Sequence, residues 1–330
     1  MDFSPEHLMD TAVRPFTAFL YADTGLYWPY LLSAGILAIG VPAILGRGTA
    51  GGAATAVGQA FSRRIWWAPS TKADYRYYVI NGILFPLIFA PAILTSGEFG
   101  LWIEATLAAM LGTRATPLFD AVTIRVLYTV AFFLAFDFGR YLAHLLQHRV
   151  AFFWQFHKVH HSAEALTPIT AFRTHPVDLL VMALGGNLLG GLVTGLFLYL
   201  GAGAVSIYLF LGLHVAHGVY NLIGNLRHSH VWLDYGPLNY IFISPAQHQI
   251  HHSTLDRHRD RNCGFAFAIW DWMFGTLYVP KEKEEFPMGL GDGSDGTWHS
   301  VGRLYWWPMV MASRVLRGAD PQPPPSSATR

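Results

Sequence analysis

Charged residues and cysteines are both scarce in this chain of 330 residues. Only 13% of the residues are charged, whereas soluble globular proteins have about 25%. Cys263 is the single cysteine, so an intrachain disulfide and a thiolate metal cluster are both excluded, and we expect a buried thiol. The net charge of +1 and the lack of a basic block give no sign of a nucleic-acid partner. The first twenty residues lack a basic start followed by an apolar run, so no signal peptide is expected.

Apolar residues make up 52% of the chain, and they gather in long runs. A membrane-spanning helix needs about 20 mostly apolar residues. Leu101–Leu111 is too short to span and is expected either to lie at the interface or to re-enter the membrane. The pattern predicts an all-α integral membrane protein with about five membrane-embedded helices, at Trp28–Leu45, Tyr77–Leu94, Ala121–Phe138, Val177–Leu200 and Ala202–Ile223.

Cationic residues indicate how these helices are oriented. Arg47, Arg63, Arg64 and Lys72 lie in the loop Gly46–Asp74, so the positive-inside rule places that loop in the cytoplasm. Alternation of five spans then predicts that the histidine-rich stretches after the third and fifth spans form a cytoplasmic cap. We expect N-terminal membrane helices over 1–120, a catalytic domain over 121–280, and an extension over 281–330 with a disordered tail, Pro321–Arg330.

Histidines are concentrated in the middle of the chain, with 13 of 16 between His144 and His252. Residues three and four apart lie on one face of a helix. Three stretches have this spacing: HLLQH at 144–148, HKVHH at 157–161 and HQIHH at 248–252. Imidazole is the commonest metal ligand in proteins, and eight rings exceed the four ligands of one zinc. The spacing therefore predicts two metal ions in one site, with ligands His144, His148, His157, His160, His161, His248, His251 and His252.

Phe156–Pro176 (FHKVHHSAEALTPITAFRTHP) and Gly236–Ser253 (GPLNYIFISPAQHQIHHS) resemble the fatty acid hydroxylase / sterol desaturase superfamily. The resemblance runs from about Phe133 to Tyr278, and is strongest to its alkylglycerol monooxygenase-like and bacterial sterol desaturase-like branches. It implies a membrane domain with a cytoplasmic cap that holds two iron ions. It also implies one or two further ligands between the second and third boxes. We predict that His228 and His217 belong to the ligand set, and His230 is a weaker candidate.

Several residues near the boxes have more than one interpretation. Asp137, Asp178 and Asp234 are candidates for orienting imidazoles through the second N–H, or else are helix caps or surface charges. His175 either shapes the site or binds substrate, or else is structural, and His214 is expected to support a metal ligand or to be structural. His7, His258 and His299 fall outside the pattern and are expected at the surface.

Oxidation of an unactivated C–H bond needs a strong oxidant made from O2, which two redox-active iron ions can provide. The function that the resemblance implies is hydroxylation or desaturation of a lipid-like substrate (a sterol, fatty acyl chain, alkylglycerol or similar), which we expect to enter from the bilayer. No nucleotide, flavin or haem motif is present, so electrons must come from a partner such as a b-type cytochrome, a ferredoxin or a reductase. The basic cluster Arg257–Arg261, or else Arg63–Arg64, is a candidate docking surface for that partner. A metal transporter and a zinc-dependent membrane hydrolase are the alternatives.

Overall fold

The computed structural model describes residues 4–44, 58 and 61–321. These residues are mostly helical, and they contain one small hairpin of two antiparallel two-residue strands. The elements are α1 (Pro5–Thr17), η1 (Ala18–Leu20), α2 (Trp28–Ile44), α4 (Arg63–Trp66), α5 (Pro69–Leu84), η2 (Phe85–Phe89), η3 (Ala90–Ala92), α6 (Ser96–Leu111), α7 (Ala121–Arg149), α8 (Ala151–His161), η4 (Pro168–Phe172), α9 (Pro176–Leu200), β1 (Leu209–Phe210), β2 (Leu213–His214), α10 (Val215–Gly224), η5 (Gly236–Tyr240), α11 (Pro245–His251), η6 (Asp256–His258), α12 (Ile269–Phe274), η7 (Thr297–His299) and α13 (Val301–Leu316).

Three helical stretches of the described residues are long and apolar enough to cross a membrane: Pro69–Leu111, Ala121–Arg149 and Pro176–Leu200. Within the described residues, the structure therefore supports three of the five predicted spans. The predicted second span and the short segment Leu101–Leu111 both lie within the first stretch, where Pro86 and Pro91 fall in the π-helical η2 and the 3₁₀-helical η3. Proline has no N–H to donate, which disturbs the α-helical hydrogen bonding there.

The predicted fifth span, Ala202–Ile223, is not one helix. Ala202, Gly203, Leu211 and Gly212 all have positive φ, so the chain turns twice and forms the β1–β2 hairpin before the ten-residue α10 begins. The predicted first span corresponds to α2, whose apolar part, Trp28–Gly40, is short for a membrane crossing. Hydropathy alone did not reveal these turns, because the residues that form them are themselves apolar or glycine.

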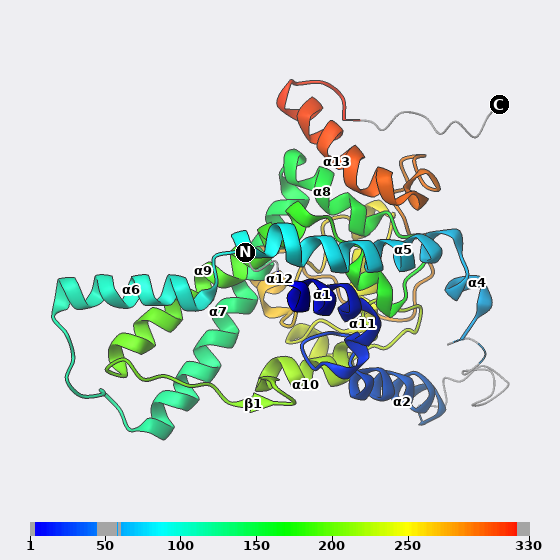
Figure 1. The fold of residues 1–330 in the computed structure, drawn as a ribbon. Helices are drawn as coiled ribbons and strands as arrows, with labels where there is room; N and C mark the ends of the chain where they lie inside the picture. Colours follow the sequence, from blue (N-terminus) through cyan, green and yellow to red (C-terminus); the bar gives the residue numbers. More distant parts are fainter. Residues whose placement is uncertain (1–3, 45–57, 59–60, 322–330) are drawn as a thin grey trace.

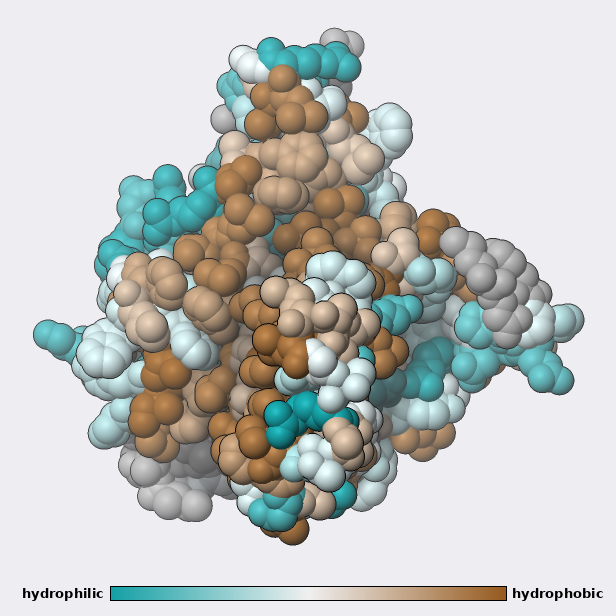
Figure 2. Space-filling view, turned by 90° about the vertical axis from the view of Figure 1, so that its left-hand side faces the viewer, coloured by the Kyte–Doolittle hydropathy of each residue, from teal (hydrophilic) through white to brown (hydrophobic). Residues whose placement is uncertain are grey.

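Helices α6, α7 and α9 form a bundle that projects from the rest of the molecule (Figure 1). Figure 2 looks onto this side and shows largely apolar residues. The exposed apolar side chains there include Trp102 and Met110 of α6, Val122 of α7, and Leu192 and Leu196 of α9. An apolar helical surface of this kind fits a lipid environment better than water.

The long helices α7 and α9 approach each other unusually closely. A Cβ added to Gly139 would lie 2.1 Å from the carbonyl oxygen of Gly185, so only glycine fits at this crossing. The inner ends of both helices leave the bundle and enter the part of the molecule built from α8, α11, α12 and α13 (Figure 1). The crossing therefore fixes where the ends of α7 and α9 sit in that part.

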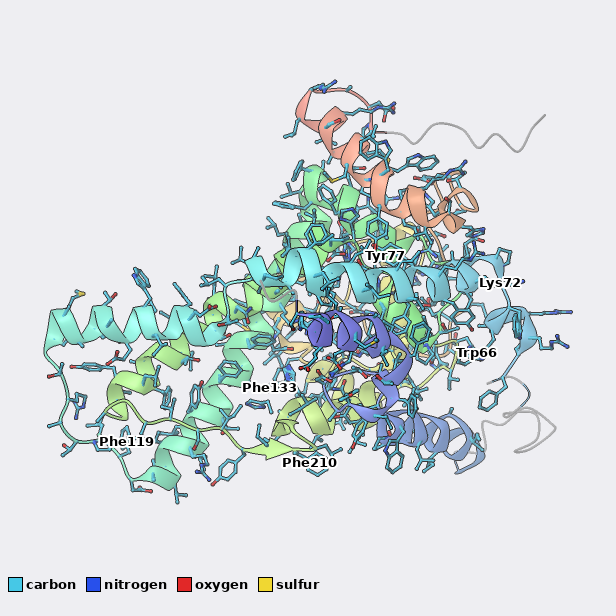
Figure 3. All side chains as sticks on the ribbon, viewed as in Figure 1. Trp66, Lys72, Tyr77, Phe119, Phe133 and Phe210 are labelled. Carbon is cyan, nitrogen blue, oxygen red and sulfur yellow. The ribbon has the colours of Figure 1, made fainter. Side chains whose placement is uncertain are left out.

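A buried cluster joins α5, α8 and α13. Tyr77, labelled in Figure 3, packs there with Val159, Trp298 and Leu304, and its hydroxyl donates to the carbonyl oxygen of Thr174. The fully buried Arg173 forms an ion pair with Asp74 at 2.8 Å and donates further hydrogen bonds to carbonyl oxygens of α8 and η7. Together these contacts hold α8, which carries one of the histidine stretches, against α5 and α13.

Two predictions concern residues that are largely outside the described part of the chain. Arg47 and about half of the predicted cytoplasmic loop fall outside the described residues, whereas Arg63 and Arg64 lie in α4 and Lys72 in α5. The predicted disordered tail also lies outside the described residues, apart from its first residue, Pro321.

Candidate metal centre

The first two histidine stretches lie on consecutive helices. His144 and His148 occupy the last turns of α7, and His157, His160 and His161 lie on α8. A single extended residue, Val150, separates the two helices, so the chain turns sharply and brings both sets of rings together. The third stretch lies on α11, which begins with a capping box between Ser244 and Gln247.

Five of these rings form one compact group. It consists of His144, His148, His157, His161 and His251, each of which places one ring nitrogen within 4.8 Å of the others. The Nε2 atom of His157 lies 3.0 Å from that of His144 and 3.2 Å from that of His161. The Nε2 atoms of His251 and His144 are 3.1 Å apart. This first group draws on α7, α8 and α11.

Four other rings form a second group by the same criterion: His160, His228, His248 and His252. The Nε2 atom of His228 lies 3.0 Å from that of His160 and 2.9 Å from that of His248. His228 comes from the segment that follows α10, so α8, α11 and this segment meet here.

The two groups are direct neighbours. The ring centroids of His161 and His252, one from each group, are 4.6 Å apart. His160 and His161 follow each other in sequence but belong to different groups. The structure thus brings nine of the ten predicted ligands together in two adjoining sets. The tenth, His217, belongs to neither set and packs against Phe133, Phe136 and Phe265 instead.

Hydrogen bonds at the opposite ring nitrogen orient four rings of the first group. The Nδ1 of His144 lies 2.7 Å from the carbonyl oxygen of Cys263, and that of His251 lies 2.7 Å from the carbonyl oxygen of Arg261. The Nδ1 of His157 faces Asp178 at 2.9 Å, and that of His148 faces Asp260 at 3.2 Å. An acceptor at Nδ1 requires the proton there, which leaves the Nε2 lone pair directed into the group.

Facing lone pairs are the feature that tests whether metal ions fit. Neutral Nε2 atoms about 3 Å apart repel one another unless a cation lies between them or protons are shared. The Nδ1 atoms of His160, His248 and His252 are buried without a hydrogen-bond partner among the described residues. Burial lowers the pKa of His160 to about 4 and holds the pKa values of His161, His248 and His252 well below the ordinary value, so the rings are neutral at pH 7. Neutral, convergent imidazoles fit divalent transition metals.

The acidic residues near the boxes differ in role from one another. Asp178 bonds to His157, as predicted for an orienting carboxylate, and also accepts from the side-chain amide of Gln147. The other two candidates follow the alternative interpretation and do not orient an imidazole. Asp137 accepts from the backbone N–H groups of Ala266 and Phe267 and from the indole of Trp270. Asp234 accepts from the backbone of Gly236 and the side chain of Asn239.

Sequence reasoning missed Asp260, which faces His148. It lies in the basic cluster Arg257–Arg261, where its neighbours suggested a docking surface instead. Its φ of 54° turns the chain, and hydrogen bonding to His148 lowers the pKa of its carboxyl group. The sequence could have identified Asp260 only by its closeness to the third histidine stretch, eight residues after His252. Helical spacing does not apply there, because the segment is a turn.

Other histidines have structural roles. The Nδ1 atoms of His175 and His214 accept from backbone N–H groups at the starts of α9 and α10, so both residues are helix N-caps. This confirms the structural interpretation of His214. His258 was expected at the surface but is fully buried, where it contacts Arg257 and Glu284. His7 is exposed as predicted, and His299 is half-buried beside Glu164.

A cavity of about 910 Å³ opens onto the histidine groups. Five of the grouped histidines line it, namely His144, His157, His160, His228 and His248. Aromatic and aliphatic side chains of α7, η4 and α9 also line it, including Phe132, Phe136, Phe172 and Met182, together with Ser96 and Gly97 at the start of α6. Phe133, labelled in Figure 3, lies behind this wall and packs on His214 and His217. The cavity therefore connects the histidines with the apolar helical bundle, and its size is that of a ligand site.

A second, smaller pocket of about 300 Å³ reaches the histidines elsewhere. His148, His161 and His251 line it, with polar residues such as Ser253, Arg259, Asp260 and Asp292. No histidine lines both spaces. The first group of rings thus has one side toward an apolar cavity and another toward a polar pocket.

Comparison with known proteins identifies the region that contains the boxes. Residues 129–276 match the family model for fatty acid hydroxylase. Ornithine lipid hydroxylase OlsE of Rhizobium tropici is 32% identical over 47% of this chain and 43% of its own length. Human alkylglycerol monooxygenase is 28% identical over 46% of this chain and 31% of its own length. A putative Δ7-sterol-C5(6)-desaturase of Arabidopsis thaliana is 28% identical over 48% of this chain and 52% of its own length. The chain thus spans about half or less of these relatives. No solved structure is significantly similar to it.

Proposed function

We propose that this chain, whose residues 129–276 are a fatty acid hydroxylase domain, is a membrane-bound oxidoreductase that hydroxylates or desaturates a lipid-like substrate. Two iron ions, held by the two histidine groups, are its proposed cofactor, and O2 is its co-substrate. A hydroxylase, a monooxygenase and a putative desaturase among the similar proteins support this class of reaction.

The single observation that carries the proposal is the pairing of the histidine groups. Nine imidazoles, seven of them on buried residues, converge in sets of five and four, and the neighbouring rings of His161 and His252 are 4.6 Å apart. One zinc ion takes four ligands, so the arrangement favours two metals. Bound there, an iron pair supplies the oxidising power from O2 that attack on an unactivated C–H bond requires.

The chain's own residues orient the ligands and exclude water. Asp178, Asp260 and the carbonyl oxygens of Cys263 and Arg261 hold the Nδ1 protons, so the Nε2 atoms stay directed inward. The large cavity gives an apolar substrate a path from the helical bundle to the rings of His144, His157 and His160. This shape supports a lipid-like substrate whose target carbon lies beside the second group and beside His144 and His157 of the first.

We further propose a multi-pass membrane protein with the metal centre on the cytoplasmic side. Three apolar helical stretches support the membrane assignment, and Arg63, Arg64 and Lys72 support a cytoplasmic position for the polar end of α5. The division into residues 1–120, 121–280 and 281–330 remains our proposal, and the family match lies within the second range. His217 as a ligand receives no support from the geometry, and His228 does.

An electron donor is part of the proposal. Complete reduction of O2 takes four electrons, and hydroxylation or desaturation of the substrate supplies only two of them. The polar pocket beside His148 and His251 offers a route for them, because the Nδ1 of His251 faces the carbonyl oxygen of Arg261 close to the surface. A b-type cytochrome, a ferredoxin or a reductase has the required chemistry.

Metal analysis combined with Mössbauer spectroscopy on anaerobically purified protein tests the function. We expect about two iron ions per chain, with nitrogen-dominated ligation, and product formation that depends on O2 and a reductant. One zinc ion and no iron would overturn the oxygenase and favour a zinc hydrolase. Metal-dependent flux across vesicles without lipid oxidation would favour a transporter.

A further inference from the structure

We propose that Arg140 and Arg227 form an anion-binding site inside the large cavity, which holds a carboxylate or phosphate group at the polar end of the substrate. The identification of the bound molecule as the substrate rests on the proposed function. The site itself is defined by the geometry of the two arginines. Both residues line the cavity that reaches the histidine groups.

Arg140 lies on α7, one helical turn before His144. Its guanidinium carbon sits 3.6 Å from the centre of the Phe265 ring. Within the described part of the chain, Arg140 donates no hydrogen bond and forms no ion pair. The carboxylates that act on it electrostatically, Asp137 and Asp178, already accept from other donors. A guanidinium has five N–H donors, and leaving them without acceptors away from bulk water is costly.

Arg227 approaches the same aromatic ring. Its guanidinium carbon is 4.4 Å from the ring centres of both Phe265 and Tyr220. Its Nε and Nη1 donate to the carbonyl oxygens of Gly224 and Phe265, which fixes the group in place and leaves Nη2 without an acceptor among the described residues. Two cations that share one ring repel each other, and an anion between or beside them removes that repulsion.

A planar guanidinium pairs best with a carboxylate or a phosphate, because its paired N–H groups match two oxygens at once. Cation–π stacking on Phe265 and Tyr220 holds the two groups in orientation before a ligand arrives. Four residues of helix separate Arg140 from His144 by a rise of only about 6 Å. The geometry therefore places the charged end of the ligand close to the metal centre, so the oxidised carbon lies near the polar end of the molecule.

Binding of matched amphiphiles tests the site. Purified full-length protein in nanodiscs is titrated with radiolabelled dodecanoate, dodecyl phosphate and dodecanol, which share a chain and differ in the head. We expect at least one of the two anions to bind about tenfold tighter than dodecanol. Arg140→Gln and Arg227→Gln should each remove most of that preference and leave dodecanol binding unchanged, while Arg140→Lys retains part of it.

Arg125→Gln is the matched control. Arg125 is also on α7 and also stacks on a tyrosine, Tyr208, but it lies outside the cavity. Equal affinity of the wild type for all three amphiphiles would overturn the proposal, as would an Arg140→Gln variant that weakens all three alike. Because the readout is a ratio on one protein sample, partial misfolding does not imitate it. Anion preference in a protein that holds no iron would refute the proposed function and leave this site standing.

Discussion

His157 on α8 and Asp178 in the first turn of α9 are joined through the Nδ1 of the imidazole at 2.9 Å. The carboxylate also accepts from Gln147 on α7, so one buried side chain links three helices. Removing such a partner of a metal ligand costs roughly 10- to 100-fold in metal affinity. We therefore expect Asp178→Ala to lose iron that much more readily when challenged with a chelator.

Asp178→Asn should have a smaller effect, because its amide oxygen still accepts a hydrogen bond. Asp256→Asn is the control, since Asp256 is exposed and pairs only with Arg259 among the described residues. Iron retained per chain after chelator treatment is the measurement. Equal retention in wild type and Asp178→Ala would show that this carboxylate does not support the metal centre.

Loss of one ring from either histidine group should abolish activity. His160 belongs to the second group and His251 to the first. We expect His160→Ala and His251→Ala each to lose lipid oxidation and at least part of the iron. His299→Ala should leave both intact, because His299 lies outside the groups and contacts Glu164. Full activity in either of the first two variants would remove that residue from the ligand set.

His217→Phe should keep the full iron content. The ring of His217 packs on Phe133 and Phe136 and belongs to neither group. Its side chain lines the large cavity, so the substitution should change KM for the lipid more than metal binding. Metal analysis of the purified variant decides the matter, and a loss of about one iron per chain would restore His217 as a ligand.

The box histidines and His217 show how much of the site could be predicted from the sequence. Spacing of three and four residues fixes which side chains share a helical face, and the structure brings all eight box histidines together. The spacing did not reveal that the second and third boxes are divided between two groups, with His160 apart from His157 and His161. Spacing does not fix the distance from one helix to another, so the sequence could not show that His217 lies outside both histidine groups. His228 lies on no helix, and only the family resemblance pointed to it.

Carboxylates show the same limit. Asp137 lies seven residues before His144, on roughly the same face of α7, yet it caps backbone N–H groups of Ala266 and Phe267 from a distant segment. Asp260 and Asp178 bond to histidines that are distant from them in sequence. The sequence pattern did not identify Asp260, and it named Asp178 only as one of three candidate carboxylates. Similarly, Ala202–Ile223 is apolar enough for a span, and its turns arise from positive φ at Ala202 and Leu211.

Gly139→Ala should destabilise the protein by roughly 3 kcal/mol, because overpacking a tight contact forces the backbones apart. The added methyl would lie 2.1 Å from the carbonyl oxygen of Gly185 on α9. Gly35→Ala on α2 is the matched control, since a Cβ there meets no atom within 4 Å. Thermal midpoints in detergent compare the two variants. A Gly139→Ala midpoint equal to that of the control would contradict the close crossing of α7 and α9.

Acidification should destabilise the protein partly through His175. Burial lowers the pKa of His175 to about 4, whereas an unfolded chain has the ordinary value near 6.5. The unfolded state therefore binds the proton first, and stability is lost as the pH falls from about 6.5 toward 4, by up to about 3 kcal/mol. His175→Asn keeps an N-cap acceptor for Val177 without a titrating group. Its thermal midpoint should fall less steeply with pH, and an unchanged slope would contradict this role.

The two openings onto the histidines have a consequence for how reactants meet. Since no histidine lines both spaces, the clustered imidazoles separate the large apolar cavity, which serves here as a chamber for the substrate, from the small polar pocket. A long-chain inhibitor lodged in the chamber leaves His148, His161 and His251 open to the aqueous side. We therefore expect dithionite or another small hydrophilic reductant to reach these rings while the inhibitor fills the cavity. Electrons and the lipid substrate would then approach the histidines from different sides.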